Sequence, residues 1–276
     1  TKMNTVTWDN LICTFIQTGC AATVERKLRE LGNKRWDKLK STPIQATTGT
    51  DLLELLKVGG TKTYVYLGTL QKLAIEVGLL THPILPKRMW PKPPKSERRA
   101  ITEEEHRRLS SNLGTTRWKT FLEILWETGA AQSDAANFRI EELAGGVVTY
   151  NRMKTGVRAA QELSPELQKM LASVAAGRTS GFFLPSIQRM DSKDRATIFR
   201  RKCHTLGIKG VTLHSYRYAW AERAFSAGMP ERLAMVALGH NSAAIHRVYA
   251  KNAKVVAPSI AGFAAATASQ SRSQAD

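Results

Sequence analysis

Apolar residues recur at helical spacing through the first eighty or so residues of the chain. In the stretch 7–31 the apolar positions lie three and four residues apart, and the stretches 51–58 and 61–77 each carry a similar apolar face. Glycines interrupt or follow these stretches, as is common at helix ends: Gly19, Gly32, Gly59, Gly60 and Gly78. The pattern predicts a small all-α domain of roughly four or five helices over residues 1–85.

The second part of the chain combines helical patterns with one short β pattern. Thr102 followed by Glu105 has the spacing of a capping box and predicts that a helix begins there. The β-branched segment 147–152 and the segment 158–163 flank a Lys-Thr-Gly turn, which predicts a hairpin. Helices are expected around this hairpin over 116–127, 133–138, 165–176, 191–206, 214–227, 230–238 and 243–248. The fold class that we expect is mainly α with a small β-hairpin or sheet.

A basic, proline-rich segment separates the two patterned regions. The eighteen residues 82–99 contain five prolines and six lysines or arginines, which excludes a regular helix over the whole segment. We therefore expect a linker over 86–100, between the helical domain at 1–85 and a second domain at 101–263. The last stretch, 264–276, is rich in alanine, serine and glutamine and is expected to be a disordered tail.

The composition adds a strong positive charge to this picture, with a formal net charge of +18. Residues 1–100 hold 17 basic and 8 acidic residues and residues 101–276 hold 24 and 15, so both parts carry the excess. Such a protein suits a polyanionic partner, DNA or RNA, because bound phosphates release their counterions. On charge alone, binding to a ribosome or to a membrane surface is also compatible.

Other classes of protein are disfavoured by the sequence. No apolar run approaches the ~18 residues of a transmembrane helix, and the N-terminus lacks the basic-then-apolar order of a signal peptide. The cysteines are odd in number and form no Cys-x-x-Cys pair: Cys13, Cys20 and Cys203. We expect them to be reduced and buried in a cytosolic protein, and we expect no metal site and no membrane partner.

The candidate chemistry lies in the stretch Thr212–Ala250. It holds His214 and Arg217 three residues apart, then His240, and then Tyr249 nine residues further on. Each motif is common by chance, and an isolated tyrosine is far more often a core or surface residue than a nucleophile. Together, however, two histidines, an arginine and a tyrosine are much of what a protein needs to attack a DNA phosphate without a metal.

This combination resembles the catalytic motif of the tyrosine recombinases, the phage-integrase family. The four side chains occur in the family's order, with its Leu-Gly-His segment and its spacing from His240 to Tyr249, and Lys154 lies on the predicted hairpin where the family has a lysine. The resemblance covers residues 101–263 by motif and residues 1–85 by size, helicity and charge. It implies a helical core-binding domain and a mixed α/β catalytic domain that close on DNA as a C-shaped clamp.

The resemblance also implies a role for each residue and no cofactor. Arg217 would hold two phosphate oxygens, which suits the charge of a pentavalent transition state. His214, one helical turn away, would handle the proton of the nucleophile, and His240 would donate to a non-bridging oxygen. Lys154 would protonate the leaving 5′-oxygen. Tyr249 would form a 3′-phosphotyrosine that keeps the bond energy, so that neither ATP nor a metal is needed.

One position departs from the family pattern, which reads Thr-Gly-x-Arg. Here residues 128–134 read TGAAQSD, and Ala131 stands where the first catalytic arginine is expected. Loss of one charged contact to a transition state typically costs about 10²–10³ in rate, so we predict impaired cleavage. An engineered Arg→Ala change and a natural loss both fit the sequence, and Ala131→Arg is expected to restore cleavage at once only in an engineered protein.

Basic residues in the linker and on a later helix are the candidate DNA contacts: Lys87, Arg88, Lys92, Lys95, Arg98, Arg99, Arg200, Arg201 and Lys202. The expected partner is double-stranded DNA at specific recombination sites. The apolar segment 253–263 would dock on a neighbouring protomer and link a homo-tetramer, as such a tail does in the family; docking on its own domain is the alternative.

The function that we expect is site-specific recombination or integration by a mobile element. One alternative is a type IB topoisomerase, which shares the residue set but acts as a monomer. Another is a non-catalytic, site-specific DNA-binding accessory protein, which the alanine at position 131 would suit. The expected location is the cytoplasm, with the nucleoid, for a prokaryotic or viral protein, and the nucleus for a eukaryotic one.

Overall fold

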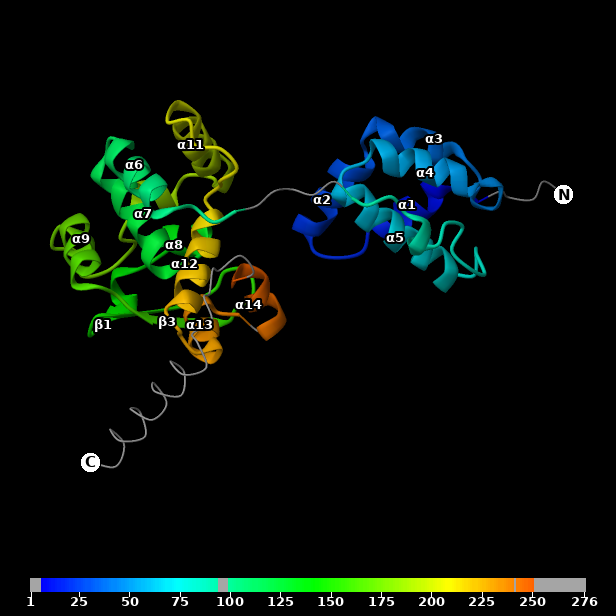
Figure 1. Ribbon diagram of the computed structural model, residues 1–276. Helices are drawn as coiled ribbons and strands as arrows, with labels where there is room; N and C mark the ends of the chain where they lie inside the picture. Colours follow the sequence, from blue (N-terminus) through cyan, green and yellow to red (C-terminus); the bar gives the residue numbers. More distant parts are fainter. Residues whose placement is uncertain (1–5, 94–98, 241, 251–276) are drawn as a thin grey trace, which may run out of the picture. The chain divides into compact units, whose positions relative to one another are not determined.

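The chain forms two compact units in a computed structural model, which describes residues 6–93, 99–240 and 242–250 (Figure 1). The division between the units falls between Ser96 and Glu97. Each unit has its own cluster of buried apolar residues. Lys95, Arg98, the expected docking segment 253–263 and the expected tail 264–276 lie outside the described residues.

Helices form the regular structure of the first unit in its described residues, apart from one β-bridge between Thr7 and Pro43. Its α-helices are α1 (Trp8–Ile16), α2 (Ala21–Leu31), α3 (Asp37–Ser41), α4 (Gly49–Val58) and α5 (Thr61–Glu76). Short 3-10 turns lie between or after them, at Lys34–Trp36, Ile44–Ala46 and Lys87–Met89. The helical character predicted for this part of the chain is confirmed.

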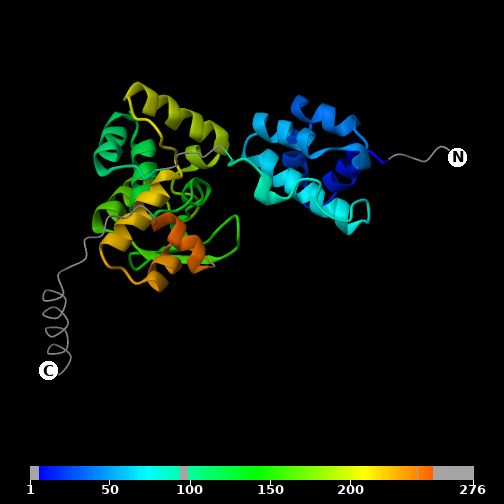
Figure 2. The same cartoon turned by 45° about the vertical axis from the view of Figure 1, so that its right-hand side comes forward.

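Two fully buried tryptophans, Trp8 and Trp36, belong to the core of this unit. Trp8 Nε1 donates to Thr47 Oγ1 at 2.7 Å, which satisfies the indole donor inside the core. The helix α1 packs against α3 and α5, the blue and cyan helices of Figure 2. The first unit therefore has a closed core of its own.

The start of the predicted linker is fastened to this unit. Leu85 is buried, its N–H donates to Gln71 Oε1 at 3.0 Å, and its carbonyl accepts from Trp90 Nε1 at 2.9 Å. Trp90 also lies edge-on against the ring of Tyr64, with the ring centroids 5.9 Å apart. Residues 85–90 are thus packed chain rather than a solvated spacer, and they fix the backbone that carries Lys87 and Arg88.

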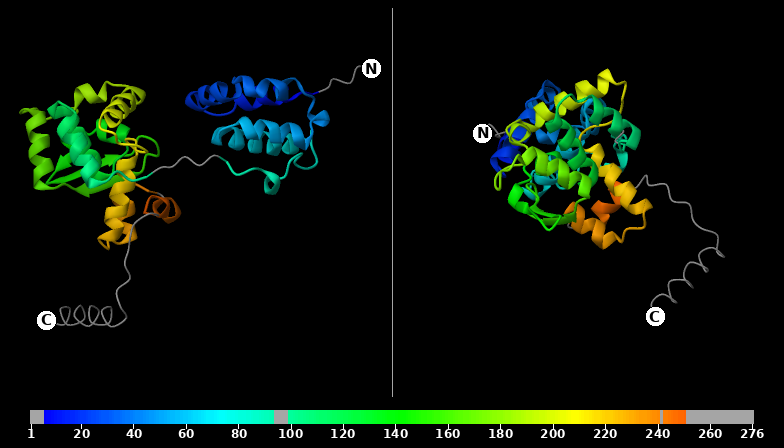
Figure 3. Two further views of the ribbon diagram at one scale, coloured as in Figure 1. Left: turned by 45° about the horizontal axis from the view of Figure 1, so that its top comes forward. Right: turned by 90° about the vertical axis from the view of Figure 1, so that its left-hand side faces the viewer.

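The second unit surrounds a small sheet with helices (Figure 3). Its elements are α6 (Glu103–Asn112), α7 (Thr116–Thr128), α8 (Gln132–Ala136), a 3-10 turn (Ile140–Glu142), β1 (Leu143–Ala144), β2 (Val147–Asn151), β3 (Arg158–Glu162), α9 (Pro165–Ala175), α10 (Pro185–Gln188), α11 (Ser192–Thr205), α12 (Ser215–Ser226), α13 (Glu231–Leu238) and α14 (Ala243–Ala250). The sheet is antiparallel in the order β1-β2-β3, and Thr149 pairs with Ala160 in the predicted hairpin. The mainly helical fold class with a small sheet is confirmed.

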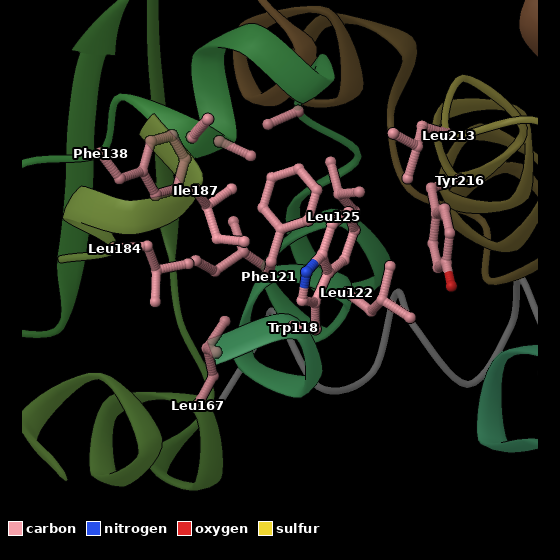
Figure 4. Close-up of a cluster of buried hydrophobic side chains, with 14 of the residues drawn as sticks. Trp118, Phe121, Leu122, Leu125, Phe138, Leu167, Leu184, Ile187, Leu213 and Tyr216 are labelled. Atoms are coloured by element: carbon pink, nitrogen blue, oxygen red, sulfur yellow. The ribbon is translucent and has the colours of Figure 1, made fainter. Parts of the chain in front are cut away.

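The core of the second unit forms around α7. Phe121, Leu122 and Leu125 of this helix are fully buried, and Figure 4 shows them among side chains from α9, α10 and α12. On its other side α7 packs against α12. A smaller buried cluster joins α12 to α13 through residues that include Trp220 and Leu238, and Tyr249 of α14 packs against that cluster. The core therefore holds together the four helices that meet at the candidate site, α7, α12, α13 and α14.

The cysteines differ from expectation in one respect. Cys203 is buried in the core of the second unit, whereas Cys13 and Cys20 are exposed. The prediction of burial is wrong for these two because Cys13 lies on the outer face of α1 and Cys20 precedes the first residue of α2.

Candidate active site

Arg217 connects the ends of two helices at the centre of the candidate site. Its Nη1 donates to the carbonyl oxygen of Gly129, just after α7, at 3.0 Å, and its Nη2 donates to that of Leu238, the last residue of α13, at 2.6 Å. Carbonyls at helix ends lack intrahelical partners, so the guanidinium satisfies groups that would otherwise be buried without one. Gly129 and Gly239 both have left-handed backbones, which end the two helices at this point.

No carboxylate among the described residues forms an ion pair with Arg217. The residue is 1% exposed, and among the residues that the structure describes no acidic side chain lies within ion-pair distance of it. Burial and the nearby charge of Arg152 lower the pKa of Arg217 to about 10, so it stays protonated at neutral pH. Its Nε is buried and has no hydrogen-bond partner within the described chain. Burial of a cation with an unused hydrogen-bond donor costs free energy unless an anion binds to it.

Tyr249 lies over this cation. The tyrosine Oη is 3.1 Å from His214 Nε2, its ring centroid is 5.4 Å from that of His214, and Arg217 Cζ is 5.4 Å from the ring centroid of Tyr249. When His214 Nε2 is unprotonated, the phenol donates its proton to it. This arrangement places a nucleophile, a proton acceptor and a fixed positive charge in one place.

His240 is held against the same ring. It is 8% exposed and stacks on Tyr249 with centroids 5.0 Å apart and planes 22° apart. Its backbone N–H donates to the carbonyl oxygen of Met235 at 2.9 Å, directly after the left-handed Gly239. The turn at Gly239 therefore directs His240 back toward α14. Of the predicted catalytic set, the structure brings His214, Arg217, His240 and Tyr249 together.

Lys154 is placed differently. It lies in the turn between β2 and β3 and is exposed, and within the described chain no hydrogen bond or ion pair joins it to the other candidates. The hairpin that carries it runs beside α13. Lys154 is thus near the end of an element that packs on the site, on a turn that leaves its side chain free to approach a ligand.

Ala131 is also next to the centre of the site. It directly precedes α8 and is two residues from Gly129, whose carbonyl Arg217 binds. Its methyl group offers no hydrogen bond to an anion. Asp134, one turn further on, is 4% exposed and accepts from the backbone N–H of Met153 at 3.0 Å.

Two residues of the site were missed at the sequence level. Tyr218 packs on Tyr249 with ring centroids 4.9 Å apart. Arg152, directly after β2, was not singled out at all; its Nε donates to Asp134 Oδ2 at 3.3 Å and its Nη1 to the carbonyl oxygen of Gly239 at 3.2 Å. The only signal in the sequence was an arginine two residues before the hairpin lysine. The sequence does not indicate where the side chain of this arginine points.

The described DNA-binding candidates fall into three surroundings. Lys87, Arg88 and Lys92 are exposed, and Lys87 and Lys92 line a groove with Tyr64, Trp90 and Lys72. Arg200 and Arg201 are exposed on α11, and Lys202 is half-buried there. The guanidinium of Arg99 is already engaged, since it binds both carboxylate oxygens of Glu105, at 2.6 and 2.7 Å, and the carbonyl oxygen of Lys209.

Among the described residues, no group of three or more histidine, cysteine, aspartate or glutamate side chains could hold a metal ion. No helix in the part of the chain that the structure describes is long and apolar enough to cross a membrane.

Comparisons with solved structures show the same fold. A lambda integrase (residues 75–356) dimer bound to a COC′ core site matches with a TM-score of 0.74 and 17% identity, covering 92% of this chain and 98% of that one. A lambda integrase tetramer bound to a Holliday junction matches with a TM-score of 0.76 and 17% identity, covering 94% and 82%. The Tn1549 transposon integrase (residues 82–397, Y379F) with transposon right-end DNA matches with a TM-score of 0.71 and 16% identity, covering 96% and 100%.

Sequence comparison gives the family directly. No curated protein sequence matches the chain. The family model described as "Phage integrase family" matches residues 99–255, a stretch that contains Ala131, Lys154, His214, Arg217, His240 and Tyr249. Because this match spans more than half of the chain, the chain belongs to the phage integrase family.

Proposed function

We propose that this protein is a site-specific DNA recombinase that cuts and rejoins DNA through a 3′-phosphotyrosine. The observation that carries the proposal is the contact of Tyr249 Oη with His214 Nε2, at 3.1 Å, directly beside the buried and uncompensated charge of Arg217. A phosphodiester is the anion that such a site fits, because its non-bridging oxygens accept from the arginine while its phosphorus faces the phenol.

In the first step the Tyr249 oxygen attacks phosphorus. A bond from this oxygen to phosphorus forms as the bond from phosphorus to the 5′-oxygen breaks, and the phenolic proton passes to His214. Lys154 delivers a proton to the leaving 5′-oxygen, and Arg217 and His240 stabilise the added charge on the non-bridging oxygens. The 5′-hydroxyl of another strand then attacks the phosphotyrosine, which releases Tyr249 and joins the new pair of strands.

Binding of the duplex is assigned to the two units together. Both carry excess positive charge, and Lys87, Arg88, Lys92, Arg200 and Arg201 are exposed donors for phosphates. The DNA bound by the lambda and Tn1549 integrases supports duplex DNA as the partner, and the lambda tetramer supports a homo-tetramer of this chain. We assign the protein to a mobile element.

The alanine at position 131 bears on the rate. The site lacks an arginine at the family's first arginine position, so cleavage by this chain is expected to be slower than by Ala131→Arg, by up to about 10²–10³. Ala131 also favours a second candidate function, that of a DNA-binding accessory protein that does not cut.

Covalent trapping separates these candidates. The full chain would first select a duplex from a random-sequence library. This duplex would then be prepared with a nick at each of several successive positions, so that the cut strand cannot be religated. We expect a denaturation-resistant adduct with Ala131→Arg and none with the Ala131→Arg, Tyr249→Phe double variant.

The other outcomes are also decisive. Specific binding without an adduct from any form would favour the accessory protein. Relaxation of a supercoiled plasmid that lacks the selected duplex would favour a type IB topoisomerase.

A further inference from the structure

We infer that Arg152 supplies to the scissile phosphate the second guanidinium that position 131 lacks. This inference rests on the proposed function and concerns how the site carries it out. Arg152 directly follows β2, and it reaches the site from the hairpin rather than from the segment after α7, where the family has its first arginine. A chain with alanine at position 131 would in this way keep two arginines for one phosphate.

The position of Arg152 is well defined by its contacts. Its side chain is 12% exposed, its Nε donates to Asp134 Oδ2 at 3.3 Å, and its Nη1 donates to the carbonyl oxygen of Gly239 at 3.2 Å. The carboxylate of Asp134 also accepts from the N–H of Met153, so it holds both the arginine and the backbone that follows it. The guanidinium is therefore fixed between α8 and the turn before His240.

The two arginines are anchored on neighbouring peptide groups. Arg217 binds the carbonyl oxygen of Leu238, and Arg152 binds that of Gly239, the next residue. Since consecutive Cα atoms are about 3.8 Å apart, both guanidinium groups are anchored at one turn of the chain. Their mutual repulsion contributes to the lowered pKa of Arg217.

Gly239 is what admits Arg152 to this place. A Cβ atom at position 239 would lie 2.6 Å from Cδ and 3.0 Å from Cγ of Arg152, closer than side chains pack. The glycine thus serves two purposes, because its left-handed backbone turns the chain toward His240 and its missing side chain leaves room for the arginine.

The local charge also indicates an anion. Asp134 neutralises one of the two guanidinium groups, and a net positive charge remains in a largely buried place. Within the described chain, Nη2 of Arg152 takes part in no hydrogen bond. It is the donor that would bind a non-bridging oxygen.

The test compares rates of adduct formation on the selected, nicked duplex. We expect the unmodified chain to form a slow adduct that requires Tyr249, and Arg152→Gln to lower its initial rate by roughly 10². The double variant Ala131→Arg, Arg152→Gln should recover at least the rate of the unmodified chain. Arg158→Gln is the matched control, because Arg158 is an exposed arginine on the paired strand of the same hairpin; its rate should be unchanged.

A second substrate separates contact with phosphate from a structural role. A methylphosphonate at the scissile position removes the charge that an arginine would neutralise, so the difference between the unmodified chain and Arg152→Gln should shrink at least about tenfold on it. Should Arg152→Gln fail to fold or bind, Arg152→Lys takes its place, since lysine can keep the ion pair with Asp134 but lacks the planar fork.

Each remaining outcome decides something. Equal rates for Arg152→Gln and Arg158→Gln, or an undiminished difference on the methylphosphonate, would overturn the role of Arg152. An adduct from Ala131→Arg but none from the unmodified chain would leave the proposed function standing and reject this inference. No adduct from any form would reject the proposed function itself.

Discussion

The guanidinium of Arg217 binds the carbonyl oxygens of Gly129 and Leu238 and also lies beside Tyr249, so one side chain joins two helix ends to the proposed nucleophile. The glycine at position 129 makes this possible. It has a φ of +60°, and a Cβ there would lie 2.7 Å from Cβ of Trp220 and 2.8 Å from Cδ2 of Leu238. The end of α7 therefore approaches α12 and α13 more closely than any other residue would allow.

Gly129→Ala is expected to destabilise the second unit by roughly 2–5 kcal/mol, from backbone strain and overpacking together. Urea unfolding of the full chain measures the change. Gly207→Ala is the control, because Gly207 has a similar φ of +69° but nothing within 4 Å of its Cβ position. It should cost only about 1–2 kcal/mol, and equal losses at both positions would contradict the close packing at Gly129.

At the scale of single residues, the sequence singled out four side chains whose catalytic roles stay predictions. His214, Arg217, His240 and Tyr249 were identified because their order and spacing are specific in combination, and the structure brings them together. Arg152 could not be found in this way. Its importance depends on its contact with Asp134, 18 residues away, and with Gly239, 87 residues away, and no local pattern encodes such contacts.

Among the elements, α4 is held at its start by a reciprocal pair of side chains. The Asp51 carboxylate accepts from the N–H and the hydroxyl of Thr48, and Thr48 Oγ1 accepts from the N–H of Asp51. These bonds to Thr48, followed by Lys38, lower the pKa of Asp51 from 3.8 to about 2. The charged form of the Asp51 carboxylate is therefore more stable in the folded state than in the unfolded one.

This shift predicts how stability changes with pH. A folded-state pKa below the unfolded value means that Asp51 adds stability above about pH 4 and loses it as the pH falls toward 2. Thermal unfolding at a series of pH values measures the effect. From pH 5 to pH 2 the melting temperature of the first unit should fall more steeply for the unmodified chain than for Asp51→Asn. Parallel profiles for the two proteins would show that the cap has no such role.

The sequence predicted some helices and strands better than others. The long periodic helices were anticipated within a few residues, and so was the hairpin, because apolar spacing reports directly on these elements. The strand β1 was missed because its two residues are too few to form a pattern. Residues 85–90 have the prolines and charges of a linker, yet Trp90 and Leu85 bind them to α5.

For the molecule as a whole, the charge of +18 predicts binding that depends on salt. Replacing Lys87, Arg88 and Lys92 together by alanine should weaken binding of the selected duplex and reduce the slope of log K against log salt by about 2.7. Fluorescence anisotropy over a range of salt concentrations provides the slope. Arg107→Ala is the control, because Arg107 is exposed but paired with Glu103 at 2.9 Å, and an equal change of slope per charge there would reject a special role for the three residues.

The site built around Arg217 also links DNA binding to the stability of the fold. Two arginines and a single carboxylate leave a positive charge in the place where the ends of α7 and α13 meet, so the empty protein carries an unfavourable electrostatic energy. A phosphate that enters relieves this energy in the native state only. By mass action, a ligand present at 100 times its Kd would stabilise that state by about 2.7 kcal/mol. We therefore expect a bound DNA strand to stabilise the second unit against unfolding.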